Sequence, residues 1–108
     1  MSYFPAHMDS TEIKIINRVI SAALQAGLTI SVADGEEWAL RASTDRAAIQ
    51  RETNATDITE YLFRRNGEKV GGVIFIHGNG VDVIHDWSDN DATDAIVRPA
   101  VDYAESLW

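Results

Sequence analysis

The sequence predicts an α+β domain, in which a five-stranded antiparallel meander sheet carries two long helices, N- and C-terminal, on one face. Apolar residues recur with helical periodicity near both ends of the chain, whereas the middle contains short alternating or apolar segments separated by turn dipeptides. After a short central helix, no connection between predicted strands is long enough for a parallel crossover. The predicted element order is therefore α-β-β-(short α)-β-β-β-α.

The first predicted helix lies within STEIKIINRVISAALQAGL, which begins at Ser10. Either Ser10 or Asp9 can cap its N-terminus, because both side chains can accept a hydrogen bond from a free backbone amide. Gly27 is suited to the left-handed position that ends many helices. The predicted apolar face consists of Ile13, Ile16, Ile20, Ala23 and Leu24.

Four of the five predicted strands form two hairpins around an Asp34-Gly35 turn and an Asn66-Gly67 turn. Between the hairpins, a Ser-Thr-Asp sequence ending at Asp45 caps a short helix over residues 46–52. Two glycines, Gly71-Gly72, indicate a bulge or a close approach of another backbone in the fourth strand. In chain order, the predicted strands cover residues 28–32, 37–42, 58–63, 69–76 and 81–87. Trp38, in the second of these strands, is expected to pack in the core.

A closing helix is predicted from Asp91 or Thr93 to Leu107. Pro99 lies inside this segment and has no amide proton to donate to the preceding turn. Two interpretations are open: the helix begins near Arg98 with Pro99 in its first turn, or a longer helix is kinked at Pro99. The predicted apolar face consists of Ile96, Val97, Ala100, Val101, Ala104 and Leu107.

Length and composition predict a single α+β domain over residues 9–108. We expect residues 1–8 to be a disordered leader or tag remnant outside this domain. The chain has no cysteine, no apolar run near the roughly 20 residues of a membrane span, and no signal-peptide pattern. We therefore expect a cytoplasmic protein with no membrane contact.

Negative charge is concentrated in the last quarter of the chain. The net charge is −8, and residues 82–108 contribute −6 of it, with seven acids and one Arg. This balance disfavours direct contact with nucleic acid, whose phosphates are bound by Lys and Arg. An acidic surface formed by Asp82, Asp86, Asp89, Asp91 and Asp94 would suit a basic protein partner, one form being mimicry of nucleic acid; the alternative is a merely solvated segment.

The last hairpin is apolar on both sides. If Asn79-Gly80 forms a two-residue turn, Phe75 faces Ile84 and His77 faces Asp82. Two helices can cover only one face of the sheet, so a second copy of the chain is expected on the other. Alternatively, the short helix and the loop after it fold over that side. The predicted interface residues are Ile74, Ile76, Val83, His85, Trp87 and Trp108.

The only cluster that resembles a metal site contains His77, Asp82, His85 and Asp86. In the predicted pairing, His77 and Asp82 are cross-strand neighbours, but His85 points to the opposite face, so three ligands do not converge. We therefore predict no metal, no cofactor and no catalytic residue, with His77 and Asp82 as the candidate ligands if a metal binds. The alternative function is a small metal-dependent or hydrolytic enzyme that uses this cluster.

Four segments together resemble a group of small bacterial proteins associated with phage and prophage genes. The resemblance covers nearly the whole chain from Glu12 and implies an accessory role, with no defined activity. The sequence therefore favours a small acidic, non-enzymatic interaction protein that acts by protein-protein contact as a homodimer. The four segments are IINRVISAALQAG, SVADGEEWALRASTD, GGVIFIHGNGVDVIHDWSDN and RPAVDYAESL.

Overall fold

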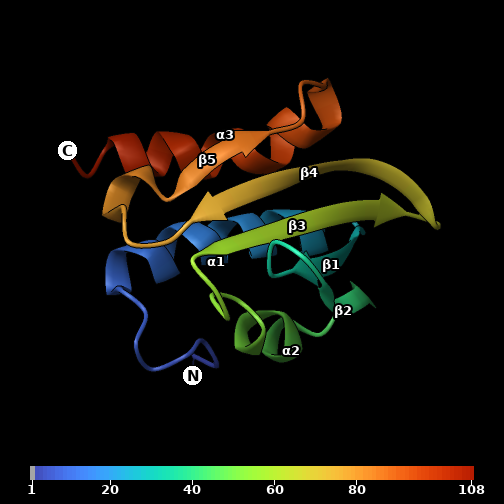
Figure 1. The fold of residues 1–108 in the computed structure, drawn as a ribbon. Coiled ribbons are helices and arrows are strands. Elements are labelled where there is room, and N and C mark those ends of the chain that lie inside the picture. Colours follow the sequence, from blue (N-terminus) through green and yellow to red (C-terminus); the bar gives the residue numbers. More distant parts are fainter. Residues whose placement is uncertain (1) are drawn as a thin grey trace.

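The structure, a computed structural model that describes residues 2–108, confirms the predicted α+β class and the order of its elements. Five antiparallel strands form one sheet in the order β2-β1-β3-β4-β5 (Figure 1). This order differs from a simple meander at one position, because β3 pairs with β1 and leaves β2 at the edge. The elements are α1 (Ser10–Gln25), β1 (Thr29–Ala33), β2 (Trp38–Ser43), α2 (Arg46–Arg51), β3 (Ile58–Arg65), β4 (Glu68–Ile76), η1 (Gly80–Asp82), β5 (Ile84–Trp87) and α3 (Asp91–Glu105).

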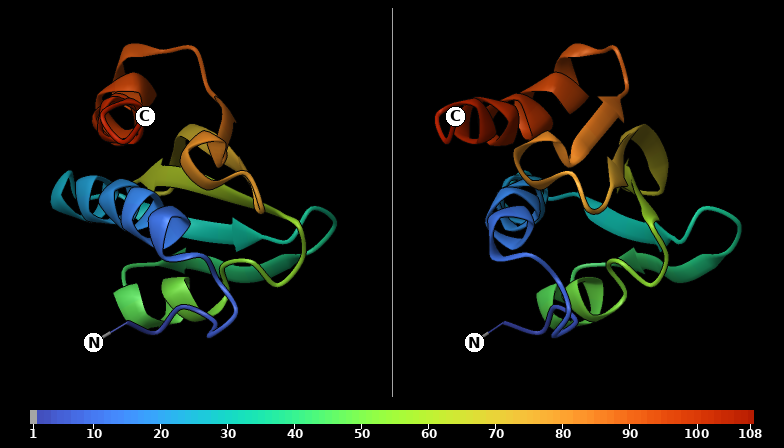
Figure 2. Two further views of the ribbon diagram at one scale, coloured as in Figure 1. Left: turned by 90° about the vertical axis from the view of Figure 1, so that its left-hand side faces the viewer. Right: turned by 60° about the vertical axis from the view of Figure 1, so that its left-hand side comes forward.

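All three α-helices lie on the same side of the sheet (Figure 2). Tyr61 and Phe63 of β3 alternate with outward residues and pack with Val73 and Phe75 of β4 beneath the helices. The rings of Tyr61 and Phe75 meet edge to face, with their centroids 4.9 Å apart. Ile49 of α2 joins the same core. One face of the sheet is therefore covered, and we call it the covered face.

Helix α1 begins and ends where the sequence predicts. The Asp9 side chain accepts a hydrogen bond from the backbone amide of Glu12 at 3.2 Å, and Gly27 follows the helix with a φ of +80°. The buried face is rotated slightly from the predicted one, because Ile13 and Leu24 are only partly buried. Its fully buried core members are Ile15, Ile16, Val19, Ile20 and Ala23.

The connection between β4 and β5 differs from the predicted two-residue turn. The 3₁₀ helix η1 lies between the strands, and β5 begins at Ile84. Phe75 pairs with Ile84 as predicted, but a register shift places Trp87 opposite Val73. Gly78 and Gly80 have positive φ angles of 94° and 56°, which let the chain turn sharply here. This segment therefore turns toward α1, where the backbone amides of Gly78 and Gly80 donate to the Glu12 side chain.

Helix α3 runs through Pro99 as one continuous helix. Its N-cap is Asn90, whose side chain accepts from the Thr93 amide at 2.8 Å. The interpretation in which the helix begins near Arg98 is therefore wrong. Pro99 is exposed and lines a groove between α3 and α1. Within residues 2–108, no helix has the length and apolar character needed to cross a membrane.

The N-terminal segment packs against the domain. Phe4 and Met8 are buried members of the core, and the backbone amide of Tyr3 donates to the Gln50 side chain of α2 at 2.8 Å. The sequence led us to expect residues 1–8 outside the fold, whereas the described part of this segment contributes apolar side chains to it. The physical reason is that burial of Phe4 and Met8 removes their apolar surface from water.

Candidate functional site

The face of the sheet opposite the helices is uncovered, and we call it the open face. Its residues follow from the register, because residues directly opposite each other on neighbouring antiparallel strands point to the same side. Leu62 pairs with Ser31 and Gly72, and Glu60 pairs with Ala33 and Ile74. The open face contains Trp38 of β2, Ile58, Glu60, Leu62 and Arg64 of β3, Lys69, Gly72, Ile74 and Ile76 of β4, and Asp86 of β5.

Large apolar side chains remain in contact with solvent on this face. Trp38 is 39% exposed and Ile58 is 42% exposed, while Leu62, Ile74 and Ile76 are partly exposed. These side chains come from β2, β3 and β4, with β1 lying between β2 and β3. They therefore form an extended apolar surface. Apolar patches of this kind typically mark a binding interface.

The chain's own short helix and the loop after it do not shield the open face. Helix α2 is on the covered face, where Thr53, just beyond the helix, shares a hydrogen bond of 2.6 Å with the Tyr61 hydroxyl. In the loop, the Thr56 hydroxyl donates to the Asp34 carbonyl at 2.5 Å, which fixes it to the β1–β2 turn at one end of the sheet. Ile58 beside it stays exposed. The alternative in which these segments cover the sheet is therefore wrong.

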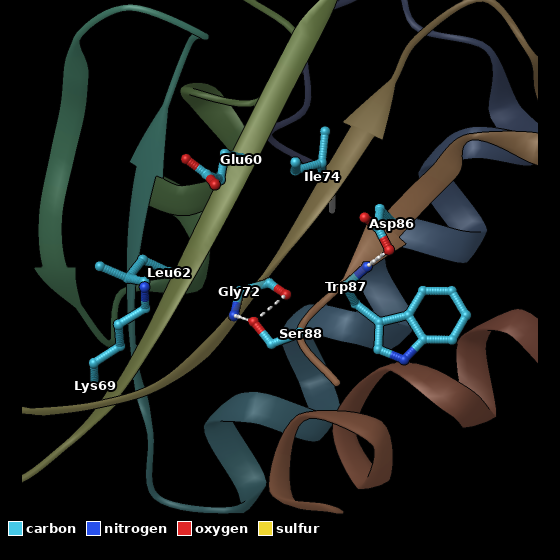
Figure 3. A pocket seen from close by; sticks show the side chains of 8 residues that line it. All are labelled: Glu60, Leu62, Lys69, Gly72, Ile74, Asp86, Trp87 and Ser88. Carbon is cyan, nitrogen blue, oxygen red and sulfur yellow. Dashed lines mark hydrogen bonds between the residues drawn. The ribbon is translucent and has the colours of Figure 1, made fainter. Parts of the chain in front are cut away.

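The centre of the open face carries a shallow pocket of about 190 Å³ (Figure 3). Its floor includes Gly72, whose amide donates to the Ser88 hydroxyl at 2.9 Å. Pockets for small organic ligands are typically about 300–1,000 Å³. The size and the open shape therefore suit a side chain of another protein better than a metabolite. The lining residues are Glu60, Leu62, Lys69, Gly72, Ile74, Asp86, Trp87 and Ser88.

The structure separates the residues that the sequence predicted to lie at an interface. Ile74 and Ile76 are on the open face, and Trp108 is 80% exposed at the C-terminus. His85 is exposed on β5. Val83 is 0% exposed and belongs to the core, so its assignment to an interface is wrong. The turn between β4 and β5 directs Val83 inward, and the sequence pattern does not reveal this.

Trp87 is held within its own chain. Its indole Nε1 donates to the Asp94 carboxylate at 3.2 Å, and the Arg98 guanidinium lies 5.1 Å from the ring centroid. The side chain therefore joins β5 to α3, and in Figure 3 its indole points away from the pocket. In contrast, Trp38 was expected in the core and is exposed, because a register shift places it opposite Ala33 on the open face.

The acidic residues of the last quarter do not form one continuous cluster. Asp82 lies in η1, before β5, whereas Asp89 lies after β5. Asp86 is on the open face, opposite Ile74. Asp91 and Asp94 occupy the first turn of α3, where negative charge stabilises the helix. These positions are compatible with solvation as well as with a basic partner.

His77 contacts Glu12 of α1 and Thr59 of β3, and not Asp82 as the sequence predicted. Its Nδ1 lies 3.2 Å from Glu12 Oε1, and its Nε2 lies 2.7 Å from the Thr59 hydroxyl. A carboxylate only accepts hydrogen bonds, so Nδ1 carries the proton and Nε2 accepts from Thr59. The pairing of His77 with Asp82 was wrong because the chain turns sharply after His77 and places Asp82 in η1.

Glu12 is a buried carboxylate at the centre of this site, and it was not identified from the sequence. Its carboxylate is buried and also accepts from the backbone amides of Gly78 and Gly80 at 2.9 and 3.0 Å. A Glu in the first turn of a helix is expected on the solvated side, and only the folded turn supplies these donors. Together, Glu12, His77 and Thr59 form a cluster that joins α1, β3 and the turn after β4, and we call it the polar cluster.

The polar cluster has the order of a catalytic triad, a carboxylate, a His and a hydroxyl. However, Thr59 is 1% exposed, and its hydroxyl already accepts from the Asn54 amide at 2.9 Å. A buried, doubly bonded hydroxyl is not available to attack a substrate. Among residues 2–108, no three His, Cys, Asp or Glu side chains come close enough together to hold a metal ion. The geometry fits a structural connection.

The stability of the protein is expected to fall below about pH 6.5 because of His77. Burial lowers the pKa of His77 below its usual value of 6.5, against the opposing effects of Glu12 and Asp57, while His7 lowers it further. The unfolded chain therefore binds a proton before the folded chain does, so this contribution is present above pH 6.5 and is lost as the pH falls toward the folded pKa. Thermal unfolding of the wild type and His77→Gln at pH 7.5 and 5.5 measures it.

The wild type should lose more stability than His77→Gln between the two pH values, by at most about 1.4 kcal/mol per pH unit for one proton. His85→Gln is the matched control, because His85 is exposed on β5. An equal pH dependence in the wild type and both variants would show that His77 does not contribute to the pH dependence of the stability.

Comparison with known proteins gave no match to a family model, to a curated protein or to a solved structure. Function must therefore be inferred from the open face and the polar cluster themselves. Of these two features, the open face is accessible to a partner, whereas the reactive atoms of the polar cluster are enclosed.

Proposed function

We propose that this protein is a small non-enzymatic accessory protein that binds another protein surface with its open face. One observation carries the proposal: all helices pack on the covered face, while Trp38, Ile58, Leu62 and Ile74 of the opposite face stay in contact with solvent. Covering such side chains stabilises a complex by about 25 cal/mol for each Å² of apolar surface removed from water.

The arrangement of charged residues around the apolar side chains supports this role. Glu60, Lys69 and Asp86 surround the central pocket, so polar groups form its rim. Protein interfaces commonly combine an apolar centre with a polar rim, and the rim contributes orientation more than affinity. The resemblance to phage-associated proteins supports an accessory role, which we propose for the cytoplasm. The acidic residues that follow β5 offer a basic partner a second contact.

The alternative, an enzyme that uses His77, Asp82 and His85, has less support. His77 is enclosed by Glu12 and Thr59, Asp82 is exposed in η1 and His85 is exposed on β5. The three side chains are distributed over separate elements and do not converge on one substrate position, which catalysis requires.

Substitution of Leu62 or Ile74 by Glu is expected to weaken binding by about tenfold or more, because a carboxylate would be buried in the complex without a partner. The fold should persist, since both side chains lie on the open face. Sedimentation velocity measures self-association, and retention of proteins from a bacterial lysate on immobilised wild type and variant measures other partners. Circular dichroism checks that each variant is folded.

Leu107→Glu is the matched control, because Leu107 is an exposed apolar residue beyond α3 and not on the sheet. It should bind as the wild type does. If the wild type, Leu62→Glu and Ile74→Glu self-associate equally and retain the same proteins, the open face is not the binding surface.

A further inference from the structure

We infer that the occupant of the open face is a second copy of this chain, packed face to face about a two-fold axis that crosses the strands. This inference rests on the proposed function and names its partner. In this arrangement the two sheets are stacked with their strands antiparallel, so that opposite ends of the two open faces meet. Three features of the sheet support it: its edges, the distribution of charge along the open face, and the lack of internal partners for those charges.

The sheet edges are poorly suited to pairing with another chain. On β2, the register with β1 shifts twice, and Ala42 has a positive φ of 46°. At the other edge, β5 has four residues and a register shift of its own. Bulged and short edge strands disfavour the addition of a further strand. Self-association through a continuous sheet is therefore disfavoured, and the open face is the remaining apolar surface of the sheet.

One end of the open face is basic. Arg64 and Lys69 are cross-strand partners at the hairpin between β3 and β4, so their side chains point to the same side, that of Leu62. The next pair, Arg65 and Glu68, points to the covered side. The acid of this hairpin is therefore directed away from the open face, and two positive charges remain on it. We call Arg64 and Lys69 the basic end.

The other end of the open face is acidic. The turn between β1 and β2 extends beyond the sheet on the side away from α1 and α3 (Figure 2). Together with residues 56–58 it lines a groove of about 700 Å³ next to the exposed Ile58. Glu60, at the start of β3, continues the negative charge toward the centre. We call the following residues the acidic end: Asp34, Glu36, Glu37, Asp57 and Glu60.

The charges at the two ends have no ion-pair partner within the described part of the chain. Among residues 2–108, the ion pairs within 4.0 Å are those of Glu12 with His77 and of Asp94 with Arg98. The basic and acidic ends are thus separated along β3 and free to pair with opposite charges on another molecule. A second copy offers such charges with the same spacing.

Symmetry determines which contacts a second copy makes. A two-fold axis parallel to the strands would place each basic end on the other basic end. An axis across the strands places the basic end of each copy on the acidic end of the other, and it stacks the apolar centres around Leu62 and Ile74. Electrostatic complementarity therefore selects the second arrangement, although the net charge of −8 on each copy opposes association at long range.

Charge reversal tests the arrangement. Arg64→Glu with Lys69→Glu makes both ends acidic, and we expect it to weaken self-association by about tenfold or more, because like charges then meet at both symmetric contacts. Adding Glu36→Lys and Glu37→Lys reduces the charge of the acidic end from −5 to −1 and returns the net charge to −8. This fourfold variant should recover part of the lost self-association, because most of the repulsion between the two ends is removed. Sedimentation velocity in 50 and 500 mM salt provides the measurement, and high salt should reduce the difference.

Lys14→Glu with Arg65→Glu is the matched control, since it changes the net charge equally at an exposed α1 residue and on the covered side of the hairpin. Three results would overturn the inference: a wild type that stays monomeric, a basic-end variant that associates as the wild type or the control does, or a fourfold variant that associates no better than the basic-end variant. If the wild type is monomeric but Leu62→Glu still abolishes retention of a lysate protein, the proposed function stands and only this inference fails. If Leu62→Glu changes neither self-association nor the retention of lysate proteins, both the proposed function and this inference are overturned.

Discussion

Glu12→Ala is expected to lower the free energy of unfolding by about 3–5 kcal/mol, because it removes the shared acceptor of several hydrogen bonds in the interior. The Glu12 carboxylate accepts from His77 Nδ1 and from the amides of Gly78 and Gly80. Alanine leaves three buried or partly buried donors without an acceptor, and each unsatisfied donor costs about 1–3 kcal/mol. Urea unfolding at pH 7.5, followed by circular dichroism, measures the change.

Glu12→Gln is the informative intermediate, because one amide oxygen can still accept while the amide nitrogen faces donors. It should lie between the wild type and Glu12→Ala. Glu105→Ala, an exposed residue near the end of α3, should stay within about 0.5 kcal/mol of the wild type. If Glu12→Ala is no more destabilising than Glu105→Ala, the polar cluster does not hold α1 to the sheet.

Gly71→Val is expected to destabilise the fold by about 3 kcal/mol or more, at or beyond the upper end of the usual cost of overpacking a core. A Cβ at Gly71 would overlap the Thr93 hydroxyl of α3 and lie 3.0 Å from the Ser88 Cβ. Thr93 is fully buried in the first turn of α3, so the helix would have to move away from β4. Urea unfolding measures the loss.

Lys69→Val introduces the same side chain at an exposed position of the same strand and should change the stability by about 0.5 kcal/mol or less. A double-mutant cycle of Gly71→Ala with Thr93→Ala isolates the contact, because removal of the Thr93 hydroxyl should recover part of the loss. Strictly additive effects would show that α3 does not pack directly on Gly71.

The two faces of the sheet thus separate stability from binding. Substitutions on the covered face or in the polar cluster should destabilise the fold, whereas substitutions on the open face should change its association and leave the fold intact. This difference gives a practical criterion for mutagenesis. A variant of Leu62 or Ile74 that fails to fold contradicts the assignment of the open face as much as one that binds normally.

Local patterns in the sequence were sufficient for most of the elements. The periodicity of α1, the Asp9 cap and the Gly27 end are local properties, and the structure confirms them. Alternation likewise predicted the strands, because the side chains of a strand alternate between two faces whatever the neighbouring strand is. Gly71-Gly72 correctly indicated a close approach of another backbone, since a Cβ at Gly72 would lie 2.8 Å from the Tyr61 carbonyl oxygen. The contact of Gly71 with the Thr93 side chain was not predicted.

Contacts between distant segments were not predictable in the same way. The sequence placed Trp38 in the core and Val83 at an interface, and the structure reverses both. Each error follows from a change of register, at the β1–β2 bulge for Trp38 and at η1 for Val83. A shift of one residue exchanges the faces of a strand, so a small local irregularity changes which side chains are exposed.

The sequence by itself therefore determined the fold class, the element order and the excess of apolar residues over what two helices can cover, because these depend on composition and local periodicity. Only the tertiary structure decided which apolar residues remain uncovered, that α2 lies on the covered face, and that Glu12, His77 and Thr59 meet. Those properties depend on strand register and on contacts between residues as far apart as Glu12 and Gly80. No local pattern encodes them, because the donors and acceptors come together only when the chain has folded.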